Sequence, residues 1–274
     1  LPLSADVNGN FSMSATGYVQ IAAGTTAQRP GTPAVGMLRF NSTLSAYEGY
    51  AGGQWSSLAA NTGFRNRLIN GTFIVDQRNS GGAQTIVAGV PAYTADRWLA
   101  SVTGANVSGQ RILSTTQYAY RFTGAASVSS VSLIQRIEAL NVFDIASTTA
   151  TLSVDLANTL LTTVTWTASY ANASNNFGAV TQIATGTFTV NSSLTRYSTN
   201  ISLPANTANG IQIVLSVGAQ VSGTFTVSNV QLEGGAQTTP MEIRPYVIEL
   251  KLCQRYYARI TVSAQCSGIG FSIS

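Results

Sequence analysis

Histidine is absent from this 274-residue sequence, and cysteine occurs only twice, as Cys253 and Cys266. The chain therefore lacks the commonest general base and the commonest metal ligand. Two cysteines cannot form a disulfide framework or a paired CxxC metal site. They could be bridged to each other, but we favour free thiols buried in an apolar setting. No apolar run approaches the roughly 18 residues of a membrane-spanning helix, so no membrane insertion is expected.

Charge is scarce as well. Charged residues make up 9% of the sequence, against about a quarter in ordinary globular proteins. The hydrophobic fraction of 45% is normal, and this argues against disorder, because disordered chains combine low hydrophobicity with high charge. The net charge is +4, but Lys251 is the only lysine and the arginines are scattered from Arg29 to Arg259. Nucleic-acid binding needs basic residues gathered on one face, so we expect no nucleic-acid partner.

The sequence is instead rich in short segments in which apolar and polar residues alternate. The period is two in residues 152–156 and again in 164–170, and Asp155 is expected on the solvated side of its strand. Gly, Asn, Ser and Pro separate such segments from residue 68 to residue 244. Short strands without helical crossovers predict an all-β fold with a jelly-roll β-sandwich at 68–244.

The N-terminal part has strands too thin to bury a core alone. Residues 1–22 place Asn8-Gly9-Asn10, which is turn chemistry, between short alternating segments. We interpret them as intertwined stalk strands that need partner chains. Residues 61–67 read as a connector to the sandwich.

A linker and hairpin module is expected at residues 23–60. A turn near Thr43 and Leu44 predicts a charge pair and an aromatic pair across the two strands, and each of these would contribute up to about 1 kcal/mol. A lone hairpin is marginal in water, so this unit should also need a partner. The predicted pairs are Arg39 with Glu48, Phe40 with Tyr47, and Met37 with Tyr50.

One short helix is expected, in residues 245–259. Pro245 suits a first helical position. The spacing of Val247, Leu250, Cys253 and Tyr257 predicts one apolar face. We expect residues 245–274 to hold this helix and the start of a further tip module.

Three segments resemble parts of phage tail proteins. Residues 24–58 read GTTAQRPGTPAVGMLRFNSTLSAYEGYAGGQWSSL and are similar to the recurrent linker-hairpin module of phage tail fibres. The opening of the carbohydrate-binding-like sandwich in these proteins resembles NRLINGTFIVDQRNSGG followed by YTADRWLAS. Its closing strand and exit helix resemble QLEGGAQTTPMEIRPYVIELKLCQRYYARI. Together the segments bracket residues 24–260, in the order that the family has them.

The resemblance implies a structural virion protein of the tail fibre, outside the cell after release. It implies a homotrimer that takes part in host attachment and contacts other tail or baseplate proteins. From the small number of acidic residues, we expect that the chain is not an enzyme. Three alternatives stay open: an adhesin module that binds host surface polysaccharide directly, a polysaccharide depolymerase, and a fibre attached to the capsid.

Aromatic pairs are the candidates for glycan binding, because flat rings stack on the apolar faces of sugars. Trp166 and Tyr170 lie four apart on one strand, and Tyr118 and Tyr120 lie two apart, so each pair shares a face. Either pair could instead fill the core or a subunit interface. Trp98 is expected in the core, with Asp96 and Arg97 making local polar contacts.

Acidic residues are too few to indicate a catalytic pair. Glycosidases need two carboxylates roughly 5–10 Å apart, and Glu138 with Glu233 is the pair that a depolymerase could use. A structural calcium ion is the one cofactor to consider. The sequence has no Asp-rich calcium loop, so Asn70 and Glu233 are the candidate ligands, and no other cofactor is expected.

Overall fold

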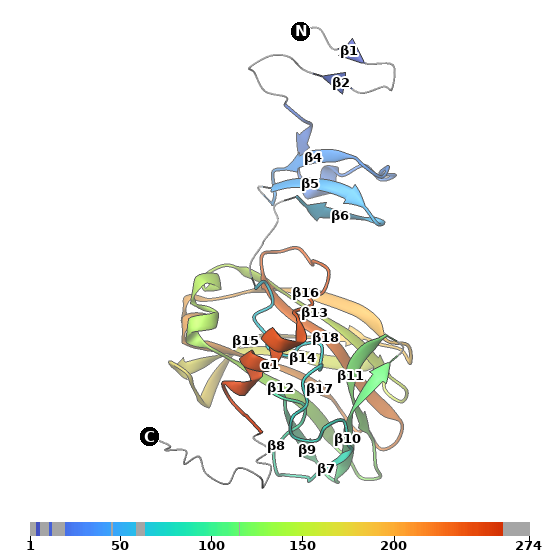
Figure 1. Ribbon diagram of the computed structural model, residues 1–274, viewed down its shortest axis with the longest axis vertical. Coiled ribbons are helices and arrows are strands. Elements are labelled where there is room, and N and C mark those ends of the chain that lie inside the picture. Colours follow the sequence, from blue (N-terminus) through green and yellow to red (C-terminus); the bar gives the residue numbers. More distant parts are fainter. Residues whose placement is uncertain are drawn as a thin grey trace, which may run out of the picture. The chain divides into compact units, whose positions relative to one another are not determined.

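The computed structural model describes residues 4–5, 11–12, 20–58 apart from 45, and 64–259 apart from 115. The chain forms two compact units, Leu1–Asn61 and Thr62–Ser274 (Figure 1). In the part of the chain that is described, no helix has the length and apolar character needed to cross a bilayer.

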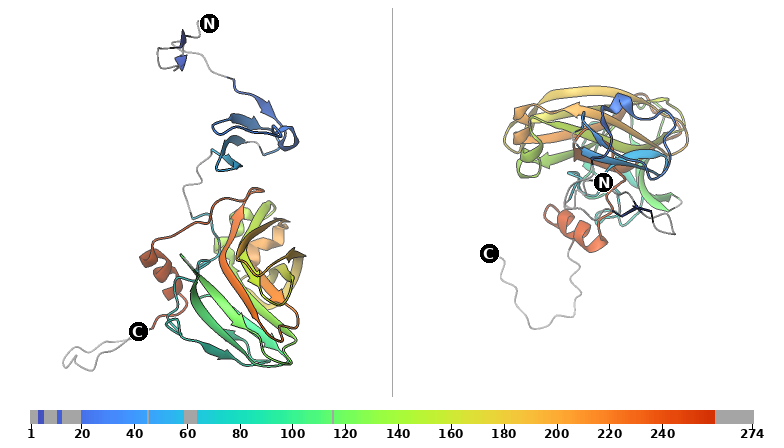
Figure 2. Two further views of the ribbon diagram at one scale, coloured as in Figure 1. Left: turned by 90° about the vertical axis from the view of Figure 1, so that its right-hand side faces the viewer. Right: turned by 90° about the horizontal axis from the view of Figure 1, so that it is seen from above.

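Two six-stranded antiparallel sheets face each other in the second unit and form the expected jelly-roll sandwich (Figure 2). The first sheet consists, in order across it, of β16 (Thr195–Ser202), β13 (Thr149–Asn158), β18 (Thr224–Gly234), β11 (Gln117–Thr123), β10 (Val107–Ser114) and β7 (Gln84–Ile86). The second consists of β15 (Asn176–Thr189), β14 (Thr163–Ala173), β17 (Gly210–Val217), β12 (Ser130–Glu138), β9 (Leu99–Thr103) and β8 (Ala92–Tyr93). Short 3-10 turns lie at η2 (Ala139–Asn141), η3 (Phe143–Ile145) and η4 (Ala205–Asn209).

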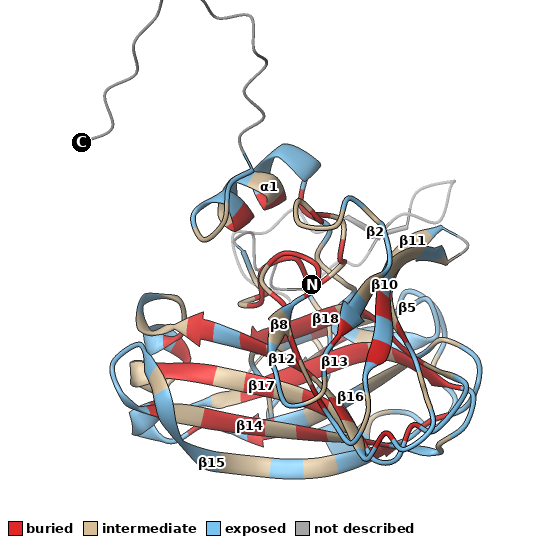
Figure 3. Cartoon of the chain, turned by 90° about the horizontal axis from the view of Figure 1, so that it is seen from below, coloured by how far each residue is buried: buried red, intermediate tan, exposed pale blue. Residues whose placement is uncertain are grey.

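The inward residues of both sheets form one core. Leu152, Val154 and Leu156 of β13 are fully buried in it, as the period-two pattern predicts. Each such side chain contributes roughly 1.5–3 kcal/mol by leaving water. Trp98 is also fully buried, stacked on Phe73 at 5.2 Å between ring centroids, which confirms its predicted core position. The buried stretches of β12, β14 and β17 are red in Figure 3.

Asp155 differs from the prediction. It lies opposite Arg196 across β13 and β16, but its side chain is only 14% exposed instead of solvated. Arg196 Nη1 lies 3.1 Å from Asp155 Oδ1, and Asn229 Nδ2 donates to Oδ2 at 2.7 Å. These partners come from strands far apart in sequence, so the local alternation could not indicate them.

Helix α1 (Tyr246–Gln254) begins one residue after the expected start, with Pro245 in extended backbone before it. Its predicted apolar face is wrong at its first position, and its last position, Tyr257, lies beyond the end of the helix. Val247 is 59% exposed, whereas Glu249 and Cys253 are buried. Cys253 is a free thiol packed near Ile69 and Val75, as expected for an apolar setting. The buried side of the helix is the side that carries Glu249, because this carboxylate has buried partners, which are described below.

The first unit contains a four-stranded sheet. Its strands are, in order, β3 (Ala23–Gly24), β4 (Leu38–Asn41), β5 (Ala46–Ala51) and β6 (Gln54–Ser57), with the 3-10 turn η1 (Thr26–Gln28) after β3. The predicted hairpin register is confirmed. Arg39 pairs with Glu48 and Phe40 with Tyr47, and Tyr50 N donates to Met37 O at 2.9 Å.

Two further strands, β1 (Ser4–Ala5) and β2 (Phe11–Ser12), pair with each other in antiparallel fashion. The predicted turn at 8–10 and the rest of the predicted stalk lie outside the described residues.

Burial in the four-stranded sheet is inverted. Among the described residues of 20–58, the buried ones are Arg39, Asn41 and Glu48, all of them polar. The opposite face carries Leu38, Phe40 and Tyr47 in register positions that alternate with the polar set. The sheet keeps its ion pairs inside and leaves Leu38 and Tyr47 on the opposite face exposed in the single chain.

Candidate functional site

A crevice of about 730 Å³ opens in the second unit between helix α1 and the β10–β11 hairpin. Its size falls in the range of small-ligand sites. Its lining mixes aromatic, polar and charged side chains from four separate segments. They are Ile74, Asp76, Gln77, Ser80, Arg111, Tyr118, Tyr246, Leu250, Gln254 and Arg259, and we call this set the Tyr118 crevice.

The hairpin register places Arg111 and Tyr118 on one side of the sheet. Arg111 lies opposite Tyr120 and Leu113 opposite Tyr118, and residues two apart share a face. The Arg111 guanidinium carbon is 4.5 Å from the centroid of the Tyr118 ring. This cation–π contact fixes both side chains at the crevice wall.

The loop after Phe73 forms the second wall. The Asp76 carboxylate accepts hydrogen bonds from the backbone N–H groups of Asn79 at 3.1 Å and Gly81 at 2.8 Å. Arg111 donates from Nη1 to Ile74 O at 2.9 Å, and its Nε lies 3.7 Å from Asp76 Oδ2. The loop is therefore tied to the hairpin through Arg111.

Helix α1 forms the third wall with Tyr246, Leu250 and Gln254, which are spaced four apart on one side of the helix. Tyr246 is 50% exposed, and Tyr118 across the crevice is half-buried. The two rings and the neighbouring amides offer apolar faces together with donors and acceptors.

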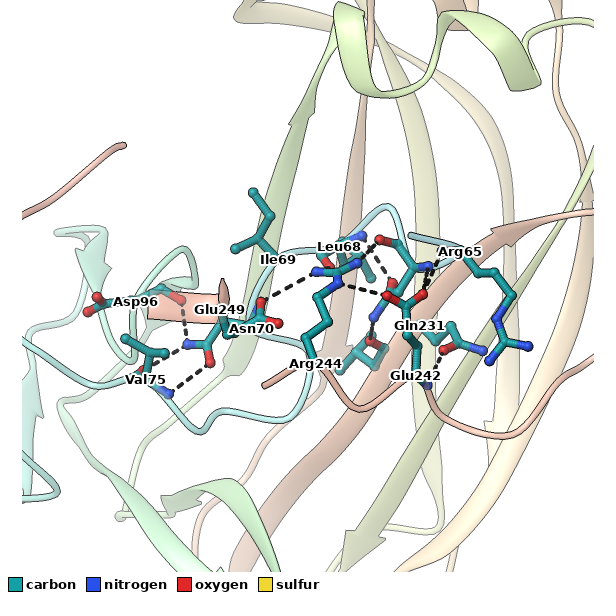
Figure 4. A network of polar contacts seen from close by, with 12 residues as sticks. Arg65, Leu68, Ile69, Asn70, Val75, Asp96, Gln231, Glu242, Arg244 and Glu249 are labelled. Atoms are coloured by element: carbon teal, nitrogen blue, oxygen red, sulfur yellow. Dashed lines mark hydrogen bonds and ion pairs between the residues drawn. The ribbon is translucent and has the colours of Figure 1, made fainter. Parts of the chain in front are cut away.

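A buried network holds the helix in place (Figure 4). Arg244 Nε donates to Glu242 at 2.8 Å, and its Nη1 lies 3.5 Å from Glu249. Glu249 also accepts a hydrogen bond from the Asn70 backbone N–H. Burial raises the pKa of Glu249, although Arg244 and the Asn70 N–H oppose this shift. The network joins the opening segment of the sandwich to the exit helix.

The chain after the helix is fixed by arginine–tyrosine stacking. The Arg78 guanidinium carbon lies 3.7 Å from the Tyr257 ring centroid, and that of Arg97 lies 3.5 Å from Tyr256. Burial lowers the pKa of Arg97. These stacks bring Arg259 to the mouth of the crevice, where its Nη1 lies 3.4 Å from Ser80 Oγ.

Of the aromatic residues predicted from the sequence, Tyr118 lies in this crevice. Tyr120 is 1% exposed in the core, its hydroxyl 3.4 Å from Gln84 Oε1, and burial raises its pKa. Trp166 and Tyr170 pair with Leu215 and Ile211 without a register shift between β14 and β17, so they share a face of β14 as predicted. Trp166 is 6% exposed, which supports its core alternative, and Tyr170 is half-buried.

The candidate acids are each committed to protein partners. Glu138 pairs with Arg255 at 2.7 Å. Glu233 accepts hydrogen bonds from the Thr239 hydroxyl at 2.6 Å and the Gln231 amide at 2.9 Å. Their partners differ, and no contact joins the two carboxylates within the described residues.

The calcium candidates are also hydrogen-bonded. Asn70 Oδ1 accepts from Val75 N at 3.0 Å, and its Nδ2 donates to Val75 O and Asp96 O. Among the residues that the structure describes, no group of three or more His, Cys, Asp or Glu side chains gathers in one place. The geometry adds no support for calcium, which stays a prediction.

No protein-family model matches the chain, and no curated protein matches it. Several solved structures are similar in part. A carbohydrate-binding module of family 4 has 16% identity and a TM-score of 0.40, covering 60% of this chain and 97% of that chain. A family 11 module from Clostridium thermocellum, in complex with a mixed-linked tetrasaccharide, has 15% identity and a TM-score of 0.37, covering 58% of this chain and 99% of that one. The enzymatically active domain of bacteriophage CBA120 tailspike protein 4 has 13% identity and a TM-score of 0.38, covering 62% of this chain and 21% of that one.

Proposed function

We propose that this chain is a non-enzymatic structural segment of a trimeric phage tail fibre that takes part in host attachment. The three ordered sequence segments support this assignment through their resemblance to tail-fibre proteins. The fibre would lie on the virion and join other tail or baseplate proteins.

The observation that carries the trimer is the uncovered apolar face of the first unit. Leu38, Tyr47 and Leu58 are 55%, 56% and 54% exposed. Leu38 and Leu58 come together over Gly49, where a Cβ would lie 3.2 and 3.3 Å from their terminal methyl carbons. Monomeric proteins rarely leave such side chains clustered on an exposed surface. In a trimer, the same face from three copies would supply the apolar core that one copy lacks.

A charge introduced into this face tests the proposal. Leu38→Asp should convert the trimer to a monomer in sedimentation velocity, because a buried unpaired charge is strongly unfavourable at an interface. Leu140→Asp is the matched control, since Leu140 is 73% exposed in the sandwich. A wild-type chain that sediments as a monomer would overturn the proposal.

The proposal that the chain is not an enzyme rests on the partners of its candidate carboxylates. A hydrolase of the two-carboxylate type needs an acid and a base or nucleophile that face one substrate. Glu138 and Glu233 are held by Arg255 and by Thr239 with Gln231, respectively. A lawn-clearing assay with Glu138→Gln and Glu233→Gln tests this: halos that depend on both residues would show a depolymerase.

A second candidate function, glycan binding by the sandwich, is favoured by the Tyr118 crevice. Tyr118 and Tyr246 offer rings for stacking, and Gln77, Gln254 and Ser80 surround them with polar groups. This is the combination that recognises sugars, since one face of a pyranose is apolar and its edges carry hydroxyls.

A glycan array on the full chain tests this candidate. Binding should be lost in Tyr246→Ala and kept in Phe143→Ala, because Phe143 is a similarly exposed ring, at 61%, outside the crevice. An array without signal at millimolar sugar would rule out the adhesin alternative and leave the sandwich as a spacer.

A further inference from the structure

The charges of the Tyr118 crevice do not balance. Its charged lining residues are Asp76, Arg111 and Arg259, so two cations face one carboxylate. The Asp76 side chain is 1% exposed, and loop N–H groups occupy its oxygens. The Asp76 carboxylate thus points into the loop, and the charged groups that face the open space of the crevice are the two arginines.

Arg111 is anchored and still has donors to offer. Its Nη1 is bound to Ile74 O, and its Nε lies 3.7 Å from Asp76. Within the described residues, its Nη2 has no hydrogen-bond partner, and the side chain keeps 18% of its surface exposed. A guanidinium fixed at one end, with free N–H groups at the other, suits bidentate binding of a planar anion.

Arg259 is the less committed of the two cations. Its contacts to Gln77 O and Ser80 Oγ are long, at 3.5 and 3.4 Å. No carboxylate pairs with it in the described part of the chain, and its side chain is exposed. Scattered arginines elsewhere in the sandwich are used differently: Arg196 and Arg67, for example, pair with Asp155 and Asp144.

From this geometry we infer that the Tyr118 crevice selects an acidic sugar, such as a uronic acid, over a neutral one. The sugar ring would stack on Tyr118 or Tyr246, and its carboxylate would lie between the Arg111 and Arg259 guanidinium groups. This inference rests on the proposed glycan binding and names the class of sugar. Charge-assisted hydrogen bonds of this kind are about twice as strong as neutral ones, so the carboxylate would dominate the affinity.

The test is calorimetric titration of the full chain with trigalacturonate, with its neutral galactotriose counterpart of the same linkage, and with inorganic phosphate. We expect trigalacturonate to bind at least about ten-fold more tightly than galactotriose. Arg259→Gln should remove most of this preference without changing the weak binding of galactotriose. Arg136→Gln, an exposed arginine on β12, is the matched control and should leave both affinities unchanged. Raising the salt concentration should weaken trigalacturonate binding only.

The outcomes separate the two proposals. Equal binding of the acidic and neutral trisaccharides would keep glycan binding and overturn the acidic preference. Phosphate that binds as tightly as trigalacturonate, with the same loss in Arg259→Gln, would reduce the crevice to an anion site and overturn the sugar. No binding of either trisaccharide would overturn the glycan proposal together with this inference.

Arg111→Lys serves as the second variant. It keeps the positive charge but not the planar guanidinium, so trigalacturonate should bind less tightly. The melting temperature of this variant shows whether the loop stays folded.

Discussion

Arg39 and Glu48 face each other inside the small N-terminal sheet, with Nε 3.4 Å from Oε1 and both side chains buried. A second arginine, Arg29, approaches the same carboxylate at 2.6 Å. The interior of this sheet, which aliphatic side chains would ordinarily fill, is filled by charged side chains. The apolar side chains Leu38 and Tyr47 of the same strands lie exposed on the opposite face.

Glu48→Gln should destabilise the first unit by about 3 kcal/mol, because it leaves buried arginine charge without its partner. Hydrogen exchange of peptides from 38–57 is the measurement, with loss of protection as the expected result. Arg29→Gln is the control: Arg29 is 24% exposed, and Arg39 remains paired, so the loss should stay near 1 kcal/mol. Equal effects of the two substitutions would contradict this ion-pair account.

The same carboxylate predicts a pH dependence. Burial pushes the pKa of Glu48 up, but hydrogen bonds from Arg29 and Asn41 outweigh it, so the pKa lies below its ordinary value of 4.5. The folded state thus binds the proton less tightly than the unfolded state. Its stabilisation is complete above pH 4.5 and is lost as the pH falls through the lowered value. The hydrogen-exchange protection of residues 38–57, corrected for intrinsic exchange rates, should fall as the pH is lowered through that range. In Glu48→Gln this fall should be absent.

The hairpin register was accessible from the sequence because it depends on residues within about a dozen positions of one another. Asp155 and Glu249 were not, because Arg196, Asn229 and Asn70 reach them from distant segments. The crevice shows the same limit. Tyr118 stood out as an aromatic on an alternating strand, and Arg111 joins it through the register of the same hairpin. Tyr246 and Arg259 reach the crevice only through the packing of the exit helix and the chain after it, which the sequence pattern could not indicate.

Glu249 should show the opposite pH dependence from Glu48. Burial raises its pKa, so the folded state holds the proton more tightly, and its contribution is lost as the pH rises from 4.5 through the raised value. Glu249→Gln should therefore be tolerated at neutral pH, since an amide oxygen can still accept from Asn70 N. Glu249→Ala should cost about 1–3 kcal/mol, because that N–H stays buried without a partner. Thermal melts of both variants from pH 4 to 8 provide the comparison, and equal melts would count against the network.

Gly186 lies against the face of Trp166, and a Cβ there would come within 2.8 Å of the ring. Gly186→Ala should cost about 1–3 kcal/mol by overpacking, since the buried ring cannot move aside. Gly218→Ala has open space around it and should be neutral. Chemical denaturation of the two variants decides, and an unaffected Gly186→Ala would mean that Trp166 is not fixed in the core.

The Cys253 thiol can report on the docking of helix α1. Burial raises its pKa, and the side chain is 1% exposed, so alkylation of the folded protein should be very slow at pH 8. In a Cys266→Ser background, Glu249→Ala should speed labelling of Cys253 at least about ten-fold, and Glu249→Gln should leave it slow. Fast labelling of the parent protein would contradict the docked helix.

Light scattering of the purified full chain across a range of concentrations tests the central claim most directly. The open apolar face of Leu38, Tyr47 and Leu58 predicts self-association, and the proposed tail-fibre assignment predicts a trimer, with three times the chain mass of 28.6 kDa at every concentration. A stable particle of 28.6 kDa would contradict the trimeric fibre.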